Sequence, residues 1–151
     1  MLQESVDLKN LSVECVDELR LPLVDHFYSS CRYRVKCGRQ EKVYSVSFGG
    51  QIIAAARFLL QKSGHFLLRN LCVAPGMRKQ GVGSFLLVTA LNELRLFAGS
   101  SNCYCFALPH LREFYISLGF TPSPLRIYLI KYQQILPTCI IVIARVIGVG
   151  F

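Results

Sequence analysis

The sequence predicts an α/β (α+β) fold, with a mixed, mostly antiparallel sheet flanked by helices on both faces. Two observations support this prediction. Apolar stretches at 43–48, 51–61 and 66–73 follow one another with short turns between them, which is typical of consecutive antiparallel strands. The amphipathic stretch 83–97 then leads to a further apolar stretch, 103–108, and a strand reached through a helix lies parallel to the strand before it.

The first third of the chain predicts a strand, a helix and a loop. Residues 4–11 are expected to form an edge strand, and residues 21–31 a helix followed by a basic loop at 32–42. Gly49-Gly50 predicts a tight hairpin turn, because glycine adopts the left-handed backbone of such turns without strain. The apolar residues on the packed side of the helix are Leu23, Val24, Phe27 and Tyr28.

The later elements are predicted from their apolar patterns and from the proline and glycine residues at their ends. The strand 66–73 ends before a Pro-Gly pair, and the helix 83–97 repeats apolar residues at the helical period. Pro109 starts a helix over 110–118 that a glycine ends. The remaining expected elements are a helix over 125–136 and a buried strand over 139–147.

At 151 residues the chain is expected to form one domain, residues 1–151, whose core needs no metal or disulfide. Apolar residues make up 52% of the sequence. The longest apolar run, 138–151, contains Arg145 and is shorter than the ~20 residues of a membrane-spanning helix. The first residues lack the basic and then apolar order of a signal peptide, so we expect a cytoplasmic protein without membrane contact.

The cysteines do not form the pattern of a metal site or a disulfide framework. There are seven, an odd number, and most stand alone in apolar stretches. Cys103 and Cys105 are close in sequence, but no second pair completes a zinc site. We therefore expect buried thiols and no bound metal.

Residues 71–84 join a strand to a helix through a basic turn that contains glycines. Gly81 and Gly83 have no Cβ atoms, so a ligand can approach the backbone, and the amide groups that begin the helix point outward. Arg78 and Lys79 add positive charges beside them. This combination predicts a binding site for a pyrophosphate group. The Gly-Lys-Ser/Thr ending of a Walker loop and the third glycine of a dinucleotide-binding turn are both missing.

The remaining pattern, Leu-x-Val-x-Pro followed by Arg-x-x-Gly-x-Gly over residues 71–83, resembles that of the GNAT N-acetyltransferases. A second segment, Phe114–Phe120, resembles the Phe-Tyr-x-x-x-Gly-Phe signature of the same family, in the family's order. The resemblance covers residues 43–120. It implies direct transfer of an acetyl group from acetyl-CoA to an amine, and a sheet splayed at its parallel pair of central strands.

The resemblance also assigns residues to the co-substrate acetyl-CoA. It places the pantetheine arm on the backbone of Leu71, Cys72 and Val73, with an amide near Val73 polarising the thioester carbonyl. Cys72 is interpreted as an inert wall, because the family transfers the acyl group directly. The residues expected to hold the pyrophosphate are Arg78, Lys79, Gln80, Gly81, Val82, Gly83 and Ser84.

Tyr115 matches the family position whose phenol acts as a general acid on the coenzyme A sulfur. A phenol and a thiol have similar pKa values, so proton transfer to the leaving thiolate is nearly balanced. The alternative is that Tyr115 only belongs to an apolar packing stripe, because Leu111, Phe114 and Leu118 share its helical spacing.

The sequence does not identify the general base that would neutralise the amine. Arg57 and Arg69 lie in otherwise apolar strands, which indicates a buried ion pair or an acidic acceptor. Leu108 replaces an Asn that often binds the pantetheine arm in the family, and His110 is a candidate substitute. The candidate bases are Asp25, His26, Glu41, Glu113 and a water molecule.

The net charge of +8 favours anionic partners: the phosphates of coenzyme A, an acidic substrate or nucleic acid. The basic residues are scattered rather than arranged in a stripe, so we do not expect nucleic acid. We expect acetyl-CoA and an amine acceptor, a small molecule or a protein amine, and leave a homodimer open. The alternative function is a non-catalytic acyl-CoA-binding or regulatory domain of the same fold.

Overall fold

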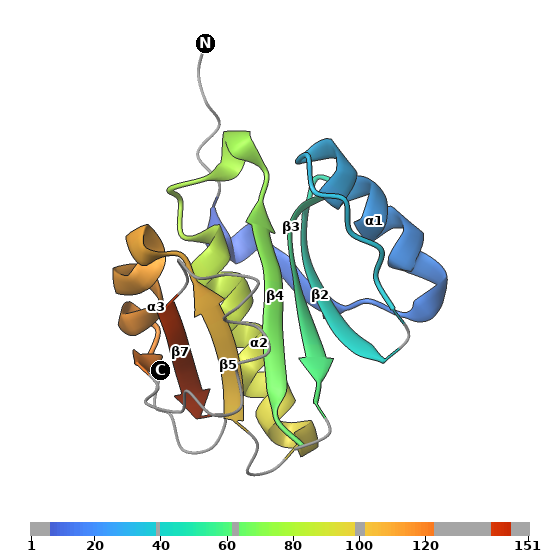
Figure 1. Cartoon of the computed structure of the whole chain (residues 1–151). Helices are drawn as coiled ribbons and strands as arrows, with labels where there is room; N and C mark the ends of the chain where they lie inside the picture. The colour runs from blue at the N-terminus through green and yellow to red at the C-terminus, as the bar shows by residue number, and fades with distance from the viewer. Residues whose placement is uncertain (1–6, 39, 62–63, 99–101, 123–139, 146–151) are drawn as a thin grey trace.

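The computed structural model describes residues 7–38, 40–61, 64–98, 102–122 and 140–145. Its sheet has seven strands in the order β1-β2-β3-β4-β5-β7-β6. Figure 1 shows β2, β3, β4, β5 and β7 side by side in this order. Among the described strands β4 and β5 are parallel and all other neighbours are antiparallel, which confirms the predicted mixed sheet. The strands are β1 (Ser12–Cys15), β2 (Glu41–Phe48), β3 (Gln51–Leu60), β4 (Phe66–Val73), β5 (Asn102–Ala107), β6 (Thr121–Pro122) and β7 (Ile140–Arg145).

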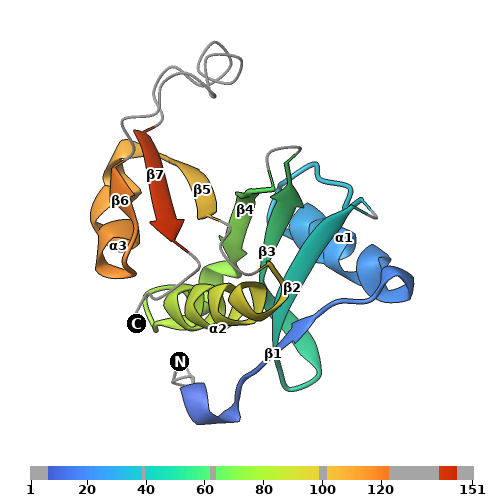
Figure 2. The ribbon, with the colours of Figure 1, turned by 90° about the horizontal axis from the view of Figure 1, so that it is seen from below.

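The α-helices are α1 (Leu21–Ser30), α2 (Val82–Ala98) and α3 (Arg112–Ser117). Figure 2 shows α1 and α2 on different sides of the sheet. The side chains of β3 alternate between two clusters: Ala54 and Phe58 lie in the cluster under α2, and Ala55 lies in the cluster under α1. The predicted helices on both faces are therefore confirmed. α3 packs beside β7 at the other end of the sheet.

Local sequence signals located most elements closely. Gly49 and Gly50 have φ angles of 59° and 78° and join β2 to β3 in the predicted hairpin. The chain passes from β4 through α2 to the parallel strand β5, as expected. Gly119, with φ of 94°, follows α3 where the sequence predicts the end of a helix.

Two predictions near the N-terminus were wrong. The edge strand is β1 and not residues 4–11, because Asp7 begins a 3-10 turn over Leu8–Asn10 by accepting a hydrogen bond from the Lys9 N–H at 3.0 Å. Leu23 is 59% exposed and does not pack. The buried residues of α1 recur at three- and four-residue spacing, which excludes position 23; they are Leu21, Val24, Phe27 and Tyr28.

Part of the C-terminal prediction cannot be compared with the structure. The helix expected over 125–136 lies outside the described residues. Of the strand expected over 139–147, the structure describes β7, which pairs with β5 and β6. None of the helices within the described ranges has both the length and the hydropathy that crossing a membrane requires.

Candidate functional site

The parallel strands β4 and β5 pair over only part of their length. On β4 the paired residues run from Phe66 to Leu68. A bulge follows directly: Asn70 has a φ of 54°, and the register between β3 and β4 shifts at this point. The two strands therefore separate toward their C-terminal ends, the edge of a sheet where ligands commonly bind.

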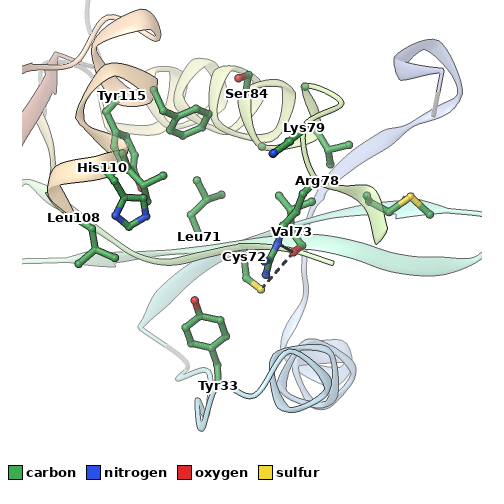
Figure 3. A pocket seen from close by; sticks show the side chains of 16 residues that line it. Tyr33, Leu71, Cys72, Val73, Arg78, Lys79, Ser84, Leu108, His110 and Tyr115 are labelled. Atoms are coloured by element: carbon green, nitrogen blue, oxygen red, sulfur yellow. Dashed lines mark hydrogen bonds between the residues drawn. The ribbon is translucent and has the colours of Figure 1, made fainter. Parts of the chain in front are cut away.

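A cavity of about 550 Å³ occupies this opening (Figure 3). It is lined by the end of β4, the loop into α2, the first turn of α2, the segment after β5 and α3. Tyr115 lines it, whereas Gln80 does not. The other residues predicted to contact acetyl-CoA all line it: Leu71, Cys72, Val73, Arg78, Lys79, Gly81, Val82, Gly83 and Ser84.

The backbone of β4 presents hydrogen-bonding groups to the cavity. The Ala74 N–H donates to the Ile53 carbonyl on β3 at 2.8 Å, and successive amides of a strand point to alternate sides. The N–H and C=O groups of Leu71 and Val73 therefore face the opening rather than β3. The Val73 carbonyl accepts a hydrogen bond from Arg78 Nε at 3.0 Å, as Figure 3 shows.

The loop between β4 and α2 brings backbone N–H groups to the mouth of the cavity. Its turn contains left-handed backbone at Lys79 and Gly81, with φ of 62° and 81°. The Phe85 N–H donates to the Gly81 carbonyl at 3.0 Å, so the preceding N–H groups of α2 have no carbonyl of their own helix to bind. Arg78 and Lys79 are exposed beside them, and this positive end of the helix favours an anion.

Gly83 keeps this part of the cavity open. A Cβ atom added here would lie 3.5 Å from Val73 Cγ2 and 3.6 Å from Phe114 Cζ. A methyl group would therefore fit, but a longer side chain would project between β4 and α3, into the space available to a ligand.

Gly81→Ala is expected to lower the free energy of unfolding by about 1–2 kcal/mol, because an L-residue at positive φ is strained. The added Cβ would be only in ordinary contact, 3.6 Å from Leu8 Cδ1, so crowding contributes little. Urea unfolding measures the difference. Gly76→Ala is the matched control, since no atom lies within 4 Å of its added Cβ and its φ is not positive. Equal losses in both variants would contradict the argument.

Tyr115 is a buried phenol at the wall of the cavity. It is 5% exposed and packs edge-on against Phe114 and Phe120, with ring centroids 5.1 and 5.3 Å apart. Burial raises the pKa of Tyr115 above its ordinary value, with a smaller contribution from the neighbouring Cys105. The side chain therefore remains a neutral phenol that can donate a proton.

The raised pKa of Tyr115 predicts the form of a pH–rate profile. Because the pKa is raised, the proton-donating form persists as the pH increases and is lost only above the ordinary phenol pKa of about 10. Turnover that depends on this proton should show no decrease from Tyr115 ionisation between about pH 7 and pH 10. Measuring kcat across that range checks this. An alkaline decrease below pH 9 that Tyr115→Phe removes would contradict it.

Cys72 forms part of the wall and is 3% exposed. Burial, with a smaller contribution from the neighbouring Cys31 thiol, raises the pKa of Cys72 to about 12. The group is therefore a thiol rather than a thiolate near neutral pH, which does not favour a nucleophilic role.

None of the four side chains predicted as general bases lines the cavity. Asp25 accepts a hydrogen bond from the Cys37 N–H at 2.7 Å, and Glu41 is paired with Arg57. The other two candidates, His26 and Glu113, are exposed elsewhere on the surface. In the part of the chain that the structure describes, no three His, Cys, Asp or Glu side chains are placed to hold a metal ion.

Tyr33 and His110 also line the cavity. The sequence suggests His110 only as a substitute for a missing Asn, and no sequence pattern marks Tyr33 as a site residue. Its position depends on α1: the Tyr33 N–H donates to the Tyr28 carbonyl at 2.9 Å, and the two rings pack edge-on. Figure 3 shows the Tyr33 hydroxyl pointing into the cavity from the side opposite Tyr115 and His110. The remaining lining residues are Met77, Leu108, Leu111 and Phe114.

The two arginines in apolar strands have different environments. Arg57 is 8% exposed and forms an ion pair with Glu41, which confirms the buried pair. Arg69 lies opposite Arg57 in the β3–β4 register but is exposed, so the prediction of a buried ion pair was wrong for this residue.

Comparison with protein families matches residues 39–122 to the family described as Acetyltransferase (GNAT) domain. A search of curated proteins finds no match. Among solved structures, 333 chains match.

Three solved structures illustrate the likeness. The ribosomal-protein-S18-alanine N-acetyltransferase from Escherichia coli has a TM-score of 0.69 and 18% identity, covering 93% of this chain and 96% of that chain. N-acetylglutamate synthase from Neisseria gonorrhoeae, complexed with coenzyme A and N-acetyl-glutamate, has a TM-score of 0.67 and 14% identity. The match covers 90% of this chain and 35% of that chain. Naa50 from Arabidopsis thaliana, in complex with the bisubstrate analogue CoA-Ac-MVNAL, has a TM-score of 0.62 and 19% identity. The match covers 89% of this chain and 97% of that chain. At these identities the likeness shows a shared fold.

Proposed function

Because the chain belongs to the GNAT acetyltransferase family, we propose that it transfers an acetyl group from acetyl-CoA directly to an amine. One observation carries the proposal: backbone groups of β4, the glycine loop at the start of α2 and the buried Tyr115 phenol all surround one cavity. Such a cavity fits a phosphorylated thioester, because it combines an apolar wall with a few convergent polar groups.

The cavity offers groups that could stabilise the thioester carbonyl, the diphosphate and the leaving thiolate. The Val73 N–H would polarise the thioester carbonyl, and one preorganised donor at a developing oxyanion contributes about 3 kcal/mol. The first N–H groups of α2, with Arg78 and Lys79, would hold the diphosphate. Tyr115 would donate its proton to the departing thiolate.

The acceptor amine would approach through the part of the cavity between Tyr33 and His110. Two features support this: Figure 3 shows both side chains away from Arg78 and Lys79, and the His110 imidazole can accept a proton from an amine directly or through water. The structural neighbours include enzymes named for a protein alanine and for glutamate. Peptide N-termini and amino acids therefore both belong in a substrate panel.

The experiment incubates the purified chain with acetyl-CoA and a panel of amines, and follows released coenzyme A and acetylated product by chromatography and mass spectrometry. We expect stoichiometric formation of both with at least one amine. Chromatographic detection is preferable to a thiol reagent because the chain itself carries seven cysteines.

A non-catalytic acyl-CoA-binding or regulatory domain is the second candidate. The observation that favours it is the position of the four candidate bases, none of which lines the cavity. Calorimetry separates the two functions. Acetyl-CoA binding without turnover on any amine, and without an effect of Tyr115→Phe, would favour the binding domain. Absence of acetyl-CoA binding would reject both.

A further inference from the structure

A polar cluster on the α1 face of the sheet surrounds the β4 bulge, and the proposed reaction gives it no role. We name it the Asn70 clamp; it comprises Tyr28 of α1, Glu41 of β2, Arg57 of β3 and Asn70 of β4. Arg57 Nη1 donates to Asn70 Oδ1 at 2.9 Å, and the Tyr28 hydroxyl donates to the Asn70 carbonyl at 2.8 Å. Glu41 binds Arg57 through both carboxylate oxygens, and Nε lies 3.0 Å from one of them. Helix α1 and strand β3 thus hold Asn70 directly, and β2 holds the Arg57 side chain that binds it.

Asn70 determines which residues of β4 face the cavity. Before it, Leu68 packs in the cluster under α2; after it, Leu71 and Val73 pack against that same cluster, and Cys72 lies in the cluster under α1. Because the side chains of a strand alternate, this pattern requires one extra residue between Leu68 and Leu71. Without the extra residue, the amide of Cys72 would face the opening in place of those of Leu71 and Val73.

The backbone of Asn70 needs support. Its φ of 54° lies in the left-handed region, which is uncommon for residues other than glycine, although Asn tolerates it better than most. Such conformations persist where surrounding contacts hold them. Here both the side-chain oxygen and the main-chain carbonyl are bound, and the donors are shielded from water: Tyr28 is fully buried and Arg57 is 8% exposed.

We propose that Asn70 is a positioning residue, and that the clamp holds the bulge in the shape that directs the Leu71 and Val73 amides toward the pantetheine arm of coenzyme A. The inference rests on the proposed function for the identity of the ligand. It predicts that disrupting the clamp weakens binding of the pantetheine arm and leaves binding of the diphosphate unchanged. The diphosphate is expected at the start of α2, whose residues the clamp does not include.

The test measures the affinity of the full chain for two ligands by isothermal titration calorimetry. One is coenzyme A; the other is its 3′-phosphorylated ADP part, which keeps the diphosphate but lacks the arm. The variants are Tyr28→Phe and Asn70→Ala. Tyr44→Phe is the matched control, since Tyr44 is equally buried but lies in the cluster under α2, and its hydroxyl has no hydrogen-bond partner among the described residues.

We expect Tyr28→Phe to weaken coenzyme A binding about fivefold and Asn70→Ala about tenfold or more, with the nucleotide part unchanged in both. Tyr44→Phe should change neither affinity. Equal losses for both ligands would show a general structural effect and overturn the inference, as would unchanged coenzyme A binding. If Asn70→Ala does not fold, Tyr28→Phe decides, because it keeps the buried ring. If the unsubstituted chain binds neither ligand, the proposed function fails first and the inference fails with it.

Discussion

Replacing Tyr115 with Phe is expected to lower kcat for acetyl transfer by about 10²–10⁴, the usual contribution of a positioned general acid. The substitution removes only the hydroxyl and keeps the ring that packs against Phe114 and Phe120. Acetyl-CoA binding should therefore be nearly unchanged, because the diphosphate and the arm are expected to be held by backbone groups elsewhere in the cavity. Steady-state kinetics at saturating acetyl-CoA and calorimetry measure the two quantities separately.

Tyr33→Phe is the matched control for this prediction. It removes a phenol from the opposite side of the same cavity, at a side chain that is 41% exposed. We expect it to affect the KM of the acceptor more than kcat, because Tyr33 lies away from the position expected for the leaving sulfur. If Tyr115→Phe leaves kcat unchanged, Tyr115 is only a member of the apolar packing stripe and not a general acid. Equal losses of kcat in both variants would also contradict the assignment.

The sequence predicted the parts of the fold whose causes are local. A glycine pair has the backbone freedom of a hairpin turn, a Pro-Gly pair ends a strand, and a helical apolar period marks α2. These signals depend on residues that are neighbours in sequence. For the same reason an anion site could be predicted at the strand-to-helix loop 71–84 from the sequence alone.

The parts that could not be predicted depend on long-range packing. The bulge at Asn70 has no local marker, because it exists through contacts with Tyr28 and Arg57, 42 and 13 residues away in sequence. The candidate base Glu41 was misplaced for a similar reason: pairing of β2 with β3 directs it to Arg57 and away from the cavity. Tyr33 reaches the cavity only because α1 docks on the sheet.

Glu41→Gln is expected to lower the free energy of unfolding by about 3–5 kcal/mol, the usual cost of removing one partner of a buried ion pair. The side chains of Arg57 and Glu41 are 10% and 6% exposed, so water cannot replace the lost carboxylate. Gln keeps the size of the side chain, and the loss therefore reports on charge rather than on a cavity. Urea unfolding measures it. A loss below about 1 kcal/mol would show that the pair behaves as a surface pair.

Two further variants separate charge burial from the positioning role. Glu14→Gln breaks the ion pair with Arg20, at 2.9 Å, whose side chains are both 43% exposed, and should cost less than about 1 kcal/mol. Replacing both partners, with Glu41→Leu and Arg57→Met together, should regain much of the stability, because no charge is left buried alone. The same double variant lacks the Arg57 donor to Asn70 Oδ1, so its affinity for coenzyme A should be lower than that of the unsubstituted chain. A stable protein with an impaired arm site would show that this ion pair serves the geometry of β4 more than the stability of the fold.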